Sequence, residues 1–210
     1  MRFIKKTSEP QFLIEFKSEF KKINRSDAAY DNINSDLKDN LKDILSYEQS
    51  FICCYCMKRI KIDNSHIEHL KPQSGYSQDS LDYFNLLVSC NGINNSNNNC
   101  GHKKGSWYDK KVFISPLDKD CEKYFSYSLS GMIDSSSDNG KKTIEKLNLN
   151  SYHLVRARKA MIDISGIFKP YFDQVKDDLI IYNKIPNSSN ELPPFCNAVL
   201  YCISNYQKKN

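Results

Sequence analysis

Five of the eight cysteines fall between residues 53 and 100, where their spacing is typical of metal ligands. Cys53 and Cys56 form a Cys-x-x-Cys pair, which places two thiolates on one tight turn and makes half of a tetrahedral zinc site. Cys90 and Cys100 would supply the other half, on either side of a stretch that contains six asparagines. Because four sulfurs close the coordination shell, we predict a structural Zn²⁺ that holds two chain segments together.

Two alternatives stay open for these cysteines. Cys54 could replace one of the four ligands, although the spacing favours Cys53, and some of the cysteines could merely pack. The other three, Cys121, Cys196 and Cys202, are scattered along the chain, and we expect them to be small buried apolar residues.

Three of the four histidines, His66, His69 and His102, lie within the cysteine framework or just past its end. The segment 65–72, SHIEHLKP, follows residues 59–63, which we predict to be a strand, so the two would form a hairpin. Neighbouring residues on a strand point to opposite sides, so Glu68 and His69 would face different surroundings. His66 and Glu68 would share one face, which suits two ligands of a single metal ion.

Four motifs in order resemble the HNH (ββα-metal) endonucleases: the CCYC turn at 53–56, EHLKP at 68–72, NLL at 85–87 and CGHKKG at 100–105. The chain resembles most closely the HNH subunit of Septu-type antiphage systems, which is also found encoded with retrons. Softer similarity in segments such as ISPLD at 114–118 and TIEKLNLN at 143–150 extends the resemblance up to about residue 170.

This resemblance implies an α+β fold, in which a ββα-metal HNH module with a four-cysteine zinc site is flanked by N- and C-terminal helices. It implies that His69 is the general base, and an unperturbed pKa of about 6.5 suits that task. Asn85 would orient the base, although it could also simply cap a short turn over 86–89. Glu68 and His102 would bind a catalytic Mg²⁺ or similar ion, and the reaction would be hydrolysis of a phosphodiester bond.

The chain departs from the family pattern at two positions. Asp or His is commoner than Glu before the base, so His66 could be a metal ligand beside Glu68 or in its place. The residue directly after the last cysteine is Gly101, where other members have Asn or His, and His102 follows it. One residue turns a helical side chain by roughly 100°, so the third ligand is open.

Basic residues near these motifs have two interpretations. Lys103 and Lys104 could contact phosphates of a nucleic acid or form a solvated helix face. Arg156, Arg158 and Lys159 fit a solvated helix surface better than a contact with nucleic acid or a partner.

Helical periodicity predicts the elements around these motifs. Apolar spacing indicates a helix over 10–23 and a second one that Ser35 would cap. A small hairpin would turn at Ser130 and Gly131. A long helix would start at Ser151 and be kinked or divided at Pro170, and a short helix would cover 195–203. We therefore expect a helical segment over 1–50, the nuclease module over 51–115 and a mostly helical segment over 116–210, in a single compact unit.

Composition limits the function classes. The net charge of +5, from 30 basic and 25 acidic residues, is compatible with a polyanionic partner without requiring one. No apolar stretch approaches the ~20 residues that span a bilayer, and the N-terminal sequence lacks the apolar core of a signal peptide, so we expect a cytoplasmic protein with no membrane partner.

Three functions compete. The leading prediction, by resemblance, is a nuclease effector of antiphage defence that works with an ATPase partner. The alternatives are a non-catalytic zinc module that binds nucleic acid or protein, and a stand-alone nuclease. The set of Glu68, His69, Asn85 and His102 favours an enzyme, because a scaffold does not require it. The sequence leaves open whether the substrate is DNA or RNA, including tRNA.

Overall fold

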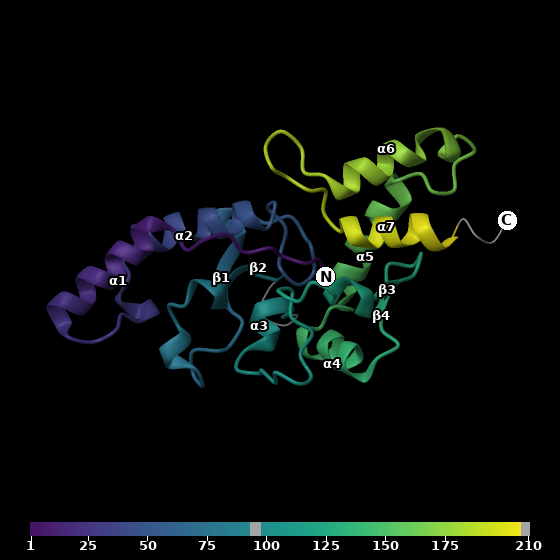
Figure 1. Ribbon diagram of the computed structural model, residues 1–210. Coiled ribbons are helices and arrows are strands. Elements are labelled where there is room, and N and C mark those ends of the chain that lie inside the picture. Colours follow the sequence, from purple (N-terminus) through teal and green to yellow (C-terminus); the bar gives the residue numbers. More distant parts are fainter. Residues whose placement is uncertain (93–97, 207–210) are drawn as a thin grey trace.

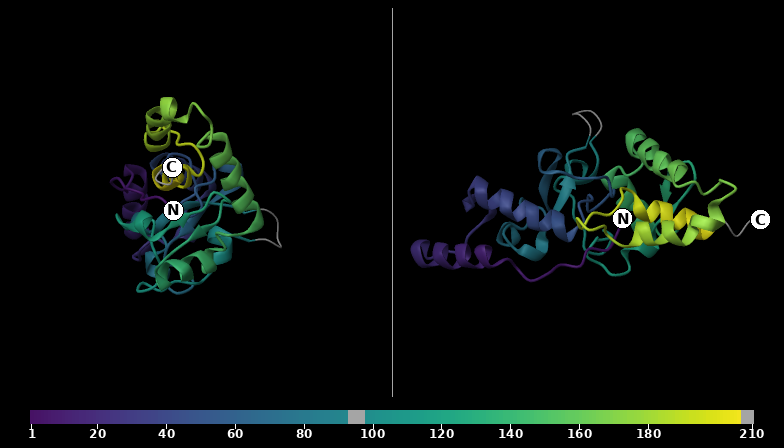
Figure 2. Two further views of the ribbon diagram at one scale, coloured as in Figure 1. Left: turned by 90° about the vertical axis from the view of Figure 1, so that its right-hand side faces the viewer. Right: turned by 90° about the horizontal axis from the view of Figure 1, so that it is seen from above.

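The computed structural model of the protein describes residues 1–92 and 98–206. The regular elements in these ranges are helices and two small two-stranded sheets. The predicted α+β class is therefore confirmed. The molecule is elongated: the first two helices extend to one end, the last helices gather at the other, and the sheet β1–β2 and helix α3 lie between them (Figures 1 and 2). The predicted loop over 91–99 lies largely outside the described residues.

The helices are α1 (Gln11–Asn24), α2 (Ser35–Glu48), α3 (Cys100–Lys104), α4 (Asp138–Leu147), α5 (Tyr152–Ile164), α6 (Phe172–Lys184) and α7 (Cys196–Tyr206). The strands are β1 (Ser65–His69), β2 (Leu86–Cys90), β3 (Ser126–Tyr127) and β4 (Ile133–Asp134). No helix in the described ranges is long and apolar enough to cross a membrane.

Helix α2 begins at Ser35, the residue predicted to be its cap, so the N-cap lies one residue earlier. The Asn34 side chain accepts a hydrogen bond from the backbone N–H of Leu37 at 2.9 Å, so Asn34 is the N-cap and the choice of Ser35 is wrong. Asn34 has the extended backbone that this position requires, whereas Ser35 already lies in the helix. Leu41 and Leu45 are fully buried, so the predicted apolar face of this helix is confirmed.

The hairpin that carries the histidines differs from the prediction. Residues 59–63 form no strand; Arg59 makes one isolated bridge to Ile52, and a short 3-10 turn covers Ile62–Asn64. The Asn64 side chain accepts from the backbone N–H of Lys61 at 2.8 Å and closes that turn, which prevents a continuous ladder. Strand β1 pairs instead with β2, antiparallel and in a register that sets Ile67 opposite Val88.

Strand β2 is the better partner because all five of its residues are buried. Its sequence, LLVSC, is a continuous run that fits a strand covered on both faces. The turn over 86–89 that Asn85 could have capped is therefore wrong, and Asn85 stands at the end of a short 3-10 turn that leads into β2. Helix α3 follows β2 in the chain and packs against it.

The C-terminal half follows the sequence pattern more closely. Strands β3 and β4 form the predicted hairpin, and Gly131 has a φ of 84° in the turn between them. The predicted long helix is divided into α5 and α6, with Pro170 between them. The scattered cysteines Cys121, Cys196 and Cys202 are buried, as predicted.

One residue of the predicted basic helix surface is wrong. Arg158 is 1% exposed, and its guanidinium donates to the carbonyl oxygens of Gly131 and, at 3.0 Å, of Leu149. These carbonyls compensate the buried charge, so Arg158 fixes the β3–β4 turn against the end of α4. Arg156 and Lys159 are exposed, as predicted.

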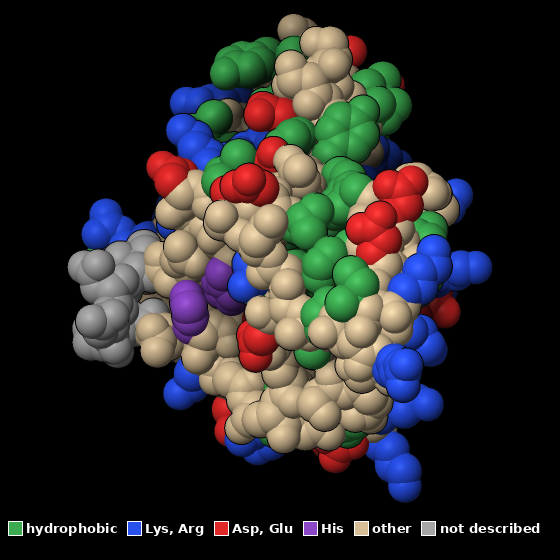
Figure 3. Space-filling model, turned by 90° about the vertical axis from the view of Figure 1, so that its left-hand side faces the viewer, with side chains coloured by type: hydrophobic (Ala, Val, Ile, Leu, Met, Phe, Trp, Pro, Cys, Tyr) green, Lys and Arg blue, Asp and Glu red, His purple; other side chains and the backbone are tan. Residues whose placement is uncertain are grey.

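Histidine side chains lie close together at the surface when the molecule is viewed from the end where α1 lies (Figure 3). The two histidine rings in contact are those of His66 on β1 and His102 on α3, whose centroids lie 4.3 Å apart. The strand pair and α3 therefore bring two of the predicted site histidines to one place.

Candidate functional site

Four buried cysteines meet where the 53–56 turn, the end of β2 and the start of α3 converge. The sulfurs of Cys53, Cys56, Cys90 and Cys100 all lie within 4.8 Å of one another. Cys54 is not in this group and packs into the core as a buried free thiol. The structure thus gathers the four cysteines that the spacing favoured.

Hydrogen bonds to the sulfurs fix this cluster. The backbone N–H groups of Lys58 and Cys90 donate to the sulfurs of Cys56 and Cys53, both at 3.4 Å, and the Asn99 side chain donates to Cys100 at 3.0 Å. Such donors stabilise thiolates rather than thiols. The turn requires Met57 in the left-handed region at a φ of 64°.

The chemistry of the four donors fits a metal ion. Burial raises the pKa of the Cys56 and Cys100 thiols well above the usual value, so ionising them without a cation is unfavourable. A dication reverses that balance, and four sulfurs in a closed shell suit Zn²⁺. The cluster could therefore hold a metal ion, and its composition is consistent with zinc.

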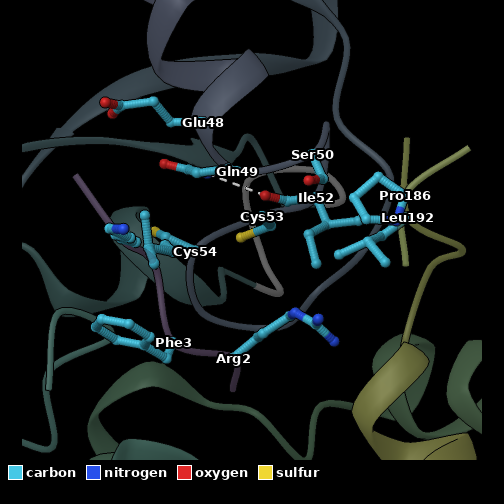
Figure 4. Close-up of a pocket in the computed structure, with 12 residues that line it drawn as sticks. Arg2, Phe3, Glu48, Gln49, Ser50, Ile52, Cys53, Cys54, Pro186 and Leu192 are labelled. Carbon is cyan, nitrogen blue, oxygen red and sulfur yellow. Dashed lines mark hydrogen bonds between the residues drawn. The ribbon is translucent and has the colours of Figure 1, made fainter. Parts of the chain in front are cut away.

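A buried glutamine connects the cluster to the rest of the fold. Gln49 donates to the carbonyl oxygens of Ile52 at 2.9 Å and Val88 at 2.8 Å, and it accepts from the backbone N–H of Val88 at 2.7 Å. Figure 4 shows Gln49 beside Cys53 and Cys54 at a cavity of about 180 Å³. Gln49 thus joins the end of α2, the cysteine turn and strand β2.

An open depression of about 280 Å³ lies at the end of β1, and Glu68, His69, Gln73 and Lys104 are among its lining residues. The predicted acid and base therefore both line one concave surface. A depression of this kind is where a substrate phosphate could approach both side chains.

The ring of His69 is held by the loop that follows β1. Its Nε2 lies 2.8 Å from the carbonyl oxygen of Ser80. A carbonyl can only accept, so Nε2 carries the proton and Nδ1 keeps a lone pair. The amide nitrogen of Gln73 lies 3.0 and 3.3 Å from the two ring nitrogens, and Tyr30 packs edge-on against the ring.

Electrostatics favour the neutral form of His69. Burial lowers its pKa and outweighs the Ser80 carbonyl and the Glu68 carboxylate, which raise it. A neutral imidazole with an unprotonated ring nitrogen is the state that a general base requires.

Asn85 holds the loop that delivers Ser80. Its side chain accepts from the backbone N–H of Lys71 at 2.7 Å and donates to the carbonyl oxygens of Lys71 at 3.1 Å and Asp79 at 3.0 Å. The backbone carbonyl of Asn85 also accepts from Leu70 at 2.9 Å. Since Asp79 precedes Ser80, this amide joins both ends of the 70–80 loop and sets the position of the carbonyl that orients His69.

Glu68 is buried and paired. Its Oε1 accepts from the hydroxyl of Tyr55 at 3.0 Å and from the ammonium of Lys104 at 2.9 Å. Burial raises the pKa of Glu68, but the hydrogen bond from His66 and the charge of Lys104 outweigh it and lower the pKa. The carboxylate is therefore ionised, with Oε2 lying 3.4 Å from Nε2 of His66.

Gly101 explains one departure from the family pattern. A Cβ atom at this position would lie 2.3 Å from Oε2 of Glu68 and 2.6 Å from Nε2 of His66. Any larger residue here would have to displace these two side-chain atoms. Since Nδ1 of His66 lies 2.9 Å from Oδ1 of Asn91, the remaining ring nitrogen is the one turned toward Glu68.

His102 is less well placed than His66. It is exposed, and burial together with the charge of His66 lowers its pKa. A compact metal site needs at least three His, Cys, Asp or Glu side chains whose ligand atoms lie close together. Across the described residues, the four cysteines are the one such group with all ligand atoms within 4.8 Å of one another. His102 therefore lies beside the pair of His66 and Glu68 without completing a compact set of three.

The two lysines of α3 have different surroundings. Lys103 is exposed, whereas Lys104 is 3% exposed, so a solvated helix face, one of the two alternatives for these lysines, is wrong for Lys104. Four further residues contact the predicted site residues and were not predicted from the sequence: Tyr55, Gln73, Ser80 and Asn91. No spacing signal singles these residues out, because they act through tertiary contacts.

The comparisons with known proteins bear on this site. No protein-family model matches the chain. A protein of Vibrio cholerae, "Retron Vc95 putative HNH endonuclease", is 34% identical over 137 residues, which cover 60% of this chain and 65% of that relative, less than two thirds of its length. A protein of Escherichia coli, "Retron Ec83 putative HNH endonuclease", is 27% identical over 209 residues, which cover 77% of this chain and 79% of the relative.

Proposed function

The chain is similar to two proteins whose names describe them as "putative HNH endonuclease" of a retron, which confirms the resemblance to the HNH family in a retron context. From this premise we propose that the protein is a metal-dependent endonuclease. It hydrolyses phosphodiester bonds of nucleic acid, either DNA or tRNA. The observation that carries the proposal is the ring of His69, which the Ser80 carbonyl fixes with Nδ1 unprotonated, beside the buried carboxylate of Glu68.

In this proposal each residue has a separate task. Nδ1 of His69 takes the proton from the attacking water, and Asn85 keeps the ring oriented through the 70–80 loop. Glu68 and His66 hold a divalent ion such as Mg²⁺, with His102 next to them. The ion supplies Lewis-acid stabilisation of the charge that develops on the phosphate oxygens. Lys103 stands exposed on α3, where it can contact a phosphate.

The four-cysteine cluster has a structural task. A Zn²⁺ ion bound by Cys53, Cys56, Cys90 and Cys100 leaves no open coordination position for a substrate. It links the start of α3 to the end of β2, and α3 also carries Gly101 and Lys104. In this assignment β1, β2 and α3 are the ββα-metal module, and the zinc holds it in shape.

The biological setting follows from the resemblance stated in the sequence analysis. The protein is the effector nuclease of an antiphage defence complex, and an ATPase subunit controls it. Co-expression with the ATPase encoded beside it should give a complex that stays together on size exclusion. Separate elution of the two proteins would contradict this part of the proposal.

A cleavage panel tests the activity and the substrate class together. Plasmid DNA and total tRNA are each incubated with the protein and its ATPase partner, in Mg²⁺ or in EDTA. Cleavage of one substrate in Mg²⁺ and none in EDTA is the expected result. No cleavage of either substrate would favour a non-catalytic module that binds nucleic acid or protein.

A further inference from the structure

Lys104 is a buried lysine whose ammonium contacts two residues of the candidate site, Glu68 and His69. It is the last residue of α3, and its side chain is 1% exposed. Its ammonium lies 2.9 Å from Oε1 of Glu68 and 2.8 Å from the carbonyl oxygen of His69. An unpaired buried ammonium is strongly unfavourable, so these two oxygens determine where the side chain lies.

Lys104 leaves Glu68 with one oxygen available. Oε1 already accepts from both Lys104 and the hydroxyl of Tyr55. Oε2 faces Nε2 of His66 and the Cα side of Gly101. The ammonium therefore fixes the rotation of the carboxylate and turns Oε2 toward the space that a cation could enter.

Lys104 also holds the general base from the helix side. His69 is the last residue of β1, and its carbonyl oxygen accepts from the ammonium of Lys104. Its ring is held separately by the carbonyl of Ser80. The backbone and the ring of His69 are thus fixed by two different elements, α3 and the 70–80 loop.

We propose that Lys104 is a positioning residue of the nuclease site, whose ammonium fixes Glu68 for one-oxygen coordination of the metal ion and fixes the backbone of His69. This role rests on the proposed nuclease function. It differs from a phosphate contact, because the ammonium is enclosed and engaged on the protein side. The ammonium also places a positive charge beside the ion, so it limits the affinity for the metal while it preserves the geometry for the reaction.

Lys104→Met separates these effects. Removing the charge frees Oε1 and lowers the repulsion of a cation, so Mn²⁺ should bind on the order of tenfold more tightly. The freed carboxylate and the looser His69 backbone should lower kcat by about 10- to 100-fold, the usual effect of losing an outer partner of a metal site. KM should change little. Mn²⁺ affinity is measured on the zinc-loaded protein by electron paramagnetic resonance of the free ion.

Lys103→Met provides the contrast. It also removes one positive charge, but from the neighbouring residue, whose side chain is exposed. It should weaken nucleic-acid binding and raise KM, with the Mn²⁺ affinity unchanged. If Lys104→Met also raises KM at an unchanged kcat, Lys104 is a phosphate contact and the positioning role is overturned. An unchanged or weaker Mn²⁺ affinity in Lys104→Met overturns it as well.

Lys104→Gln keeps the test open if the methionine variant does not fold. Its amide is neutral but can still donate hydrogen bonds to Glu68 and His69, so tighter Mn²⁺ binding with a smaller loss of kcat is expected. If the wild type cuts no nucleic acid, the proposed function fails while the Mn²⁺ measurement still decides the role of Lys104. A wild type that binds no Mn²⁺ overturns the role of Lys104, whatever the cleavage assay gives.

Discussion

At the residue scale, a few side chains fix the site through backbone contacts rather than through contact with a substrate. Asn85 joins both ends of the 70–80 loop, and that loop supplies the Ser80 carbonyl that sets the tautomer of His69. Gly101 leaves space for Glu68 and His66. The chemistry assigned to His69 therefore depends on residues that do no chemistry themselves.

Asn85→Ala should lose its three side-chain hydrogen bonds and leave buried backbone groups unpaired. We expect a loss of about 2–4 kcal/mol in the free energy of unfolding, from about 1 kcal/mol per bond plus the desolvation cost. Since the His69 ring is released, kcat should fall more than KM rises. Urea unfolding and cleavage kinetics measure the two effects, and Asn85→Asp, which keeps the acceptor for Lys71, should fall between Asn85→Ala and the wild type.

Gly101→Ala tests whether the space beside α3 is needed. Alanine normally stabilises a helix by about 1 kcal/mol relative to glycine. Here the added Cβ would lie 2.3 Å from Oε2 of Glu68, so displacement of that carboxylate should dominate. We expect cleavage to fall at least tenfold with the zinc content unchanged. Gly75→Ala is the matched control, because a Cβ there meets nothing within 4 Å; an active Gly101→Ala would contradict the packing argument.

At the element scale, the sequence predicted local features better than strand pairing. Cysteine spacing identified the four cluster residues, and apolar periodicity found α1, α2, the divided helix of α5 and α6, and α7, because both signals are local. Helix α4 was not predicted. The predicted partner of β1, residues 59–63, was wrong because the alternation of polar and apolar residues does not reveal which strands pair. The actual partner, β2, follows β1 only after a long loop. Ser80 and Gln73 lie in that loop, and Lys104 lies on α3. Their contacts with the site residues cannot be predicted from the spacing of residues in the sequence.

The N-terminal segment and α2 are joined by a buried ion pair whose pH dependence can be measured. Lys6 lies 2.7 Å from Glu48 at the end of α2, and both side chains are buried. Burial raises the pKa of Glu48, but hydrogen bonds from Lys6 and Thr7 outweigh it and lower the pKa. A lowered pKa in the folded state means that the pair stabilises the fold above the unfolded pKa and ceases to do so as the pH falls through the folded pKa.

Glu48→Gln should therefore destabilise the protein by about 3 kcal/mol at pH 7, the scale for breaking a buried pair. The difference from the wild type should shrink as the pH is lowered below about 4.5, the usual pKa of the carboxyl. Urea unfolding of both proteins at several pH values measures it. A difference that stays constant down to pH 3 would show that the charge of Glu48 does not contribute.

At the scale of the whole molecule, β2 and α3, which carry two of the four cluster cysteines, lie between the N-terminal helices and the C-terminal helices (Figure 1). The 53–56 turn, β2 and α3 meet at the cysteine cluster, and the backbone carbonyl of Met57 accepts from Phe195 just before α7 at 2.9 Å. A metal ion at this position would couple the candidate site to both ends of the chain.

Cys56→Ser should lose zinc and stability together. Structural zinc sites contribute on the order of 10 kcal/mol of binding free energy, so we expect this variant to melt far below the wild type or to remain unfolded. Cys54→Ser is the matched control, because Cys54 is buried nearby but outside the four-sulfur group. Elemental analysis gives the zinc content of both variants, and thermal unfolding gives their stability. Full zinc content in Cys56→Ser, or zinc loss in Cys54→Ser, would contradict the assignment.

The most direct test of the proposed nuclease is the single-turnover cleavage rate of His69→Ala, measured in Mg²⁺ with the ATPase partner present. His153→Ala is the control, because His153 is an exposed histidine on α5, outside the site. We predict that His69→Ala keeps its zinc and its fold but cuts about 10²- to 10⁴-fold more slowly, the usual contribution of a general base, whereas His153→Ala cuts like the wild type. Cleavage by His69→Ala at the wild-type rate would contradict the account.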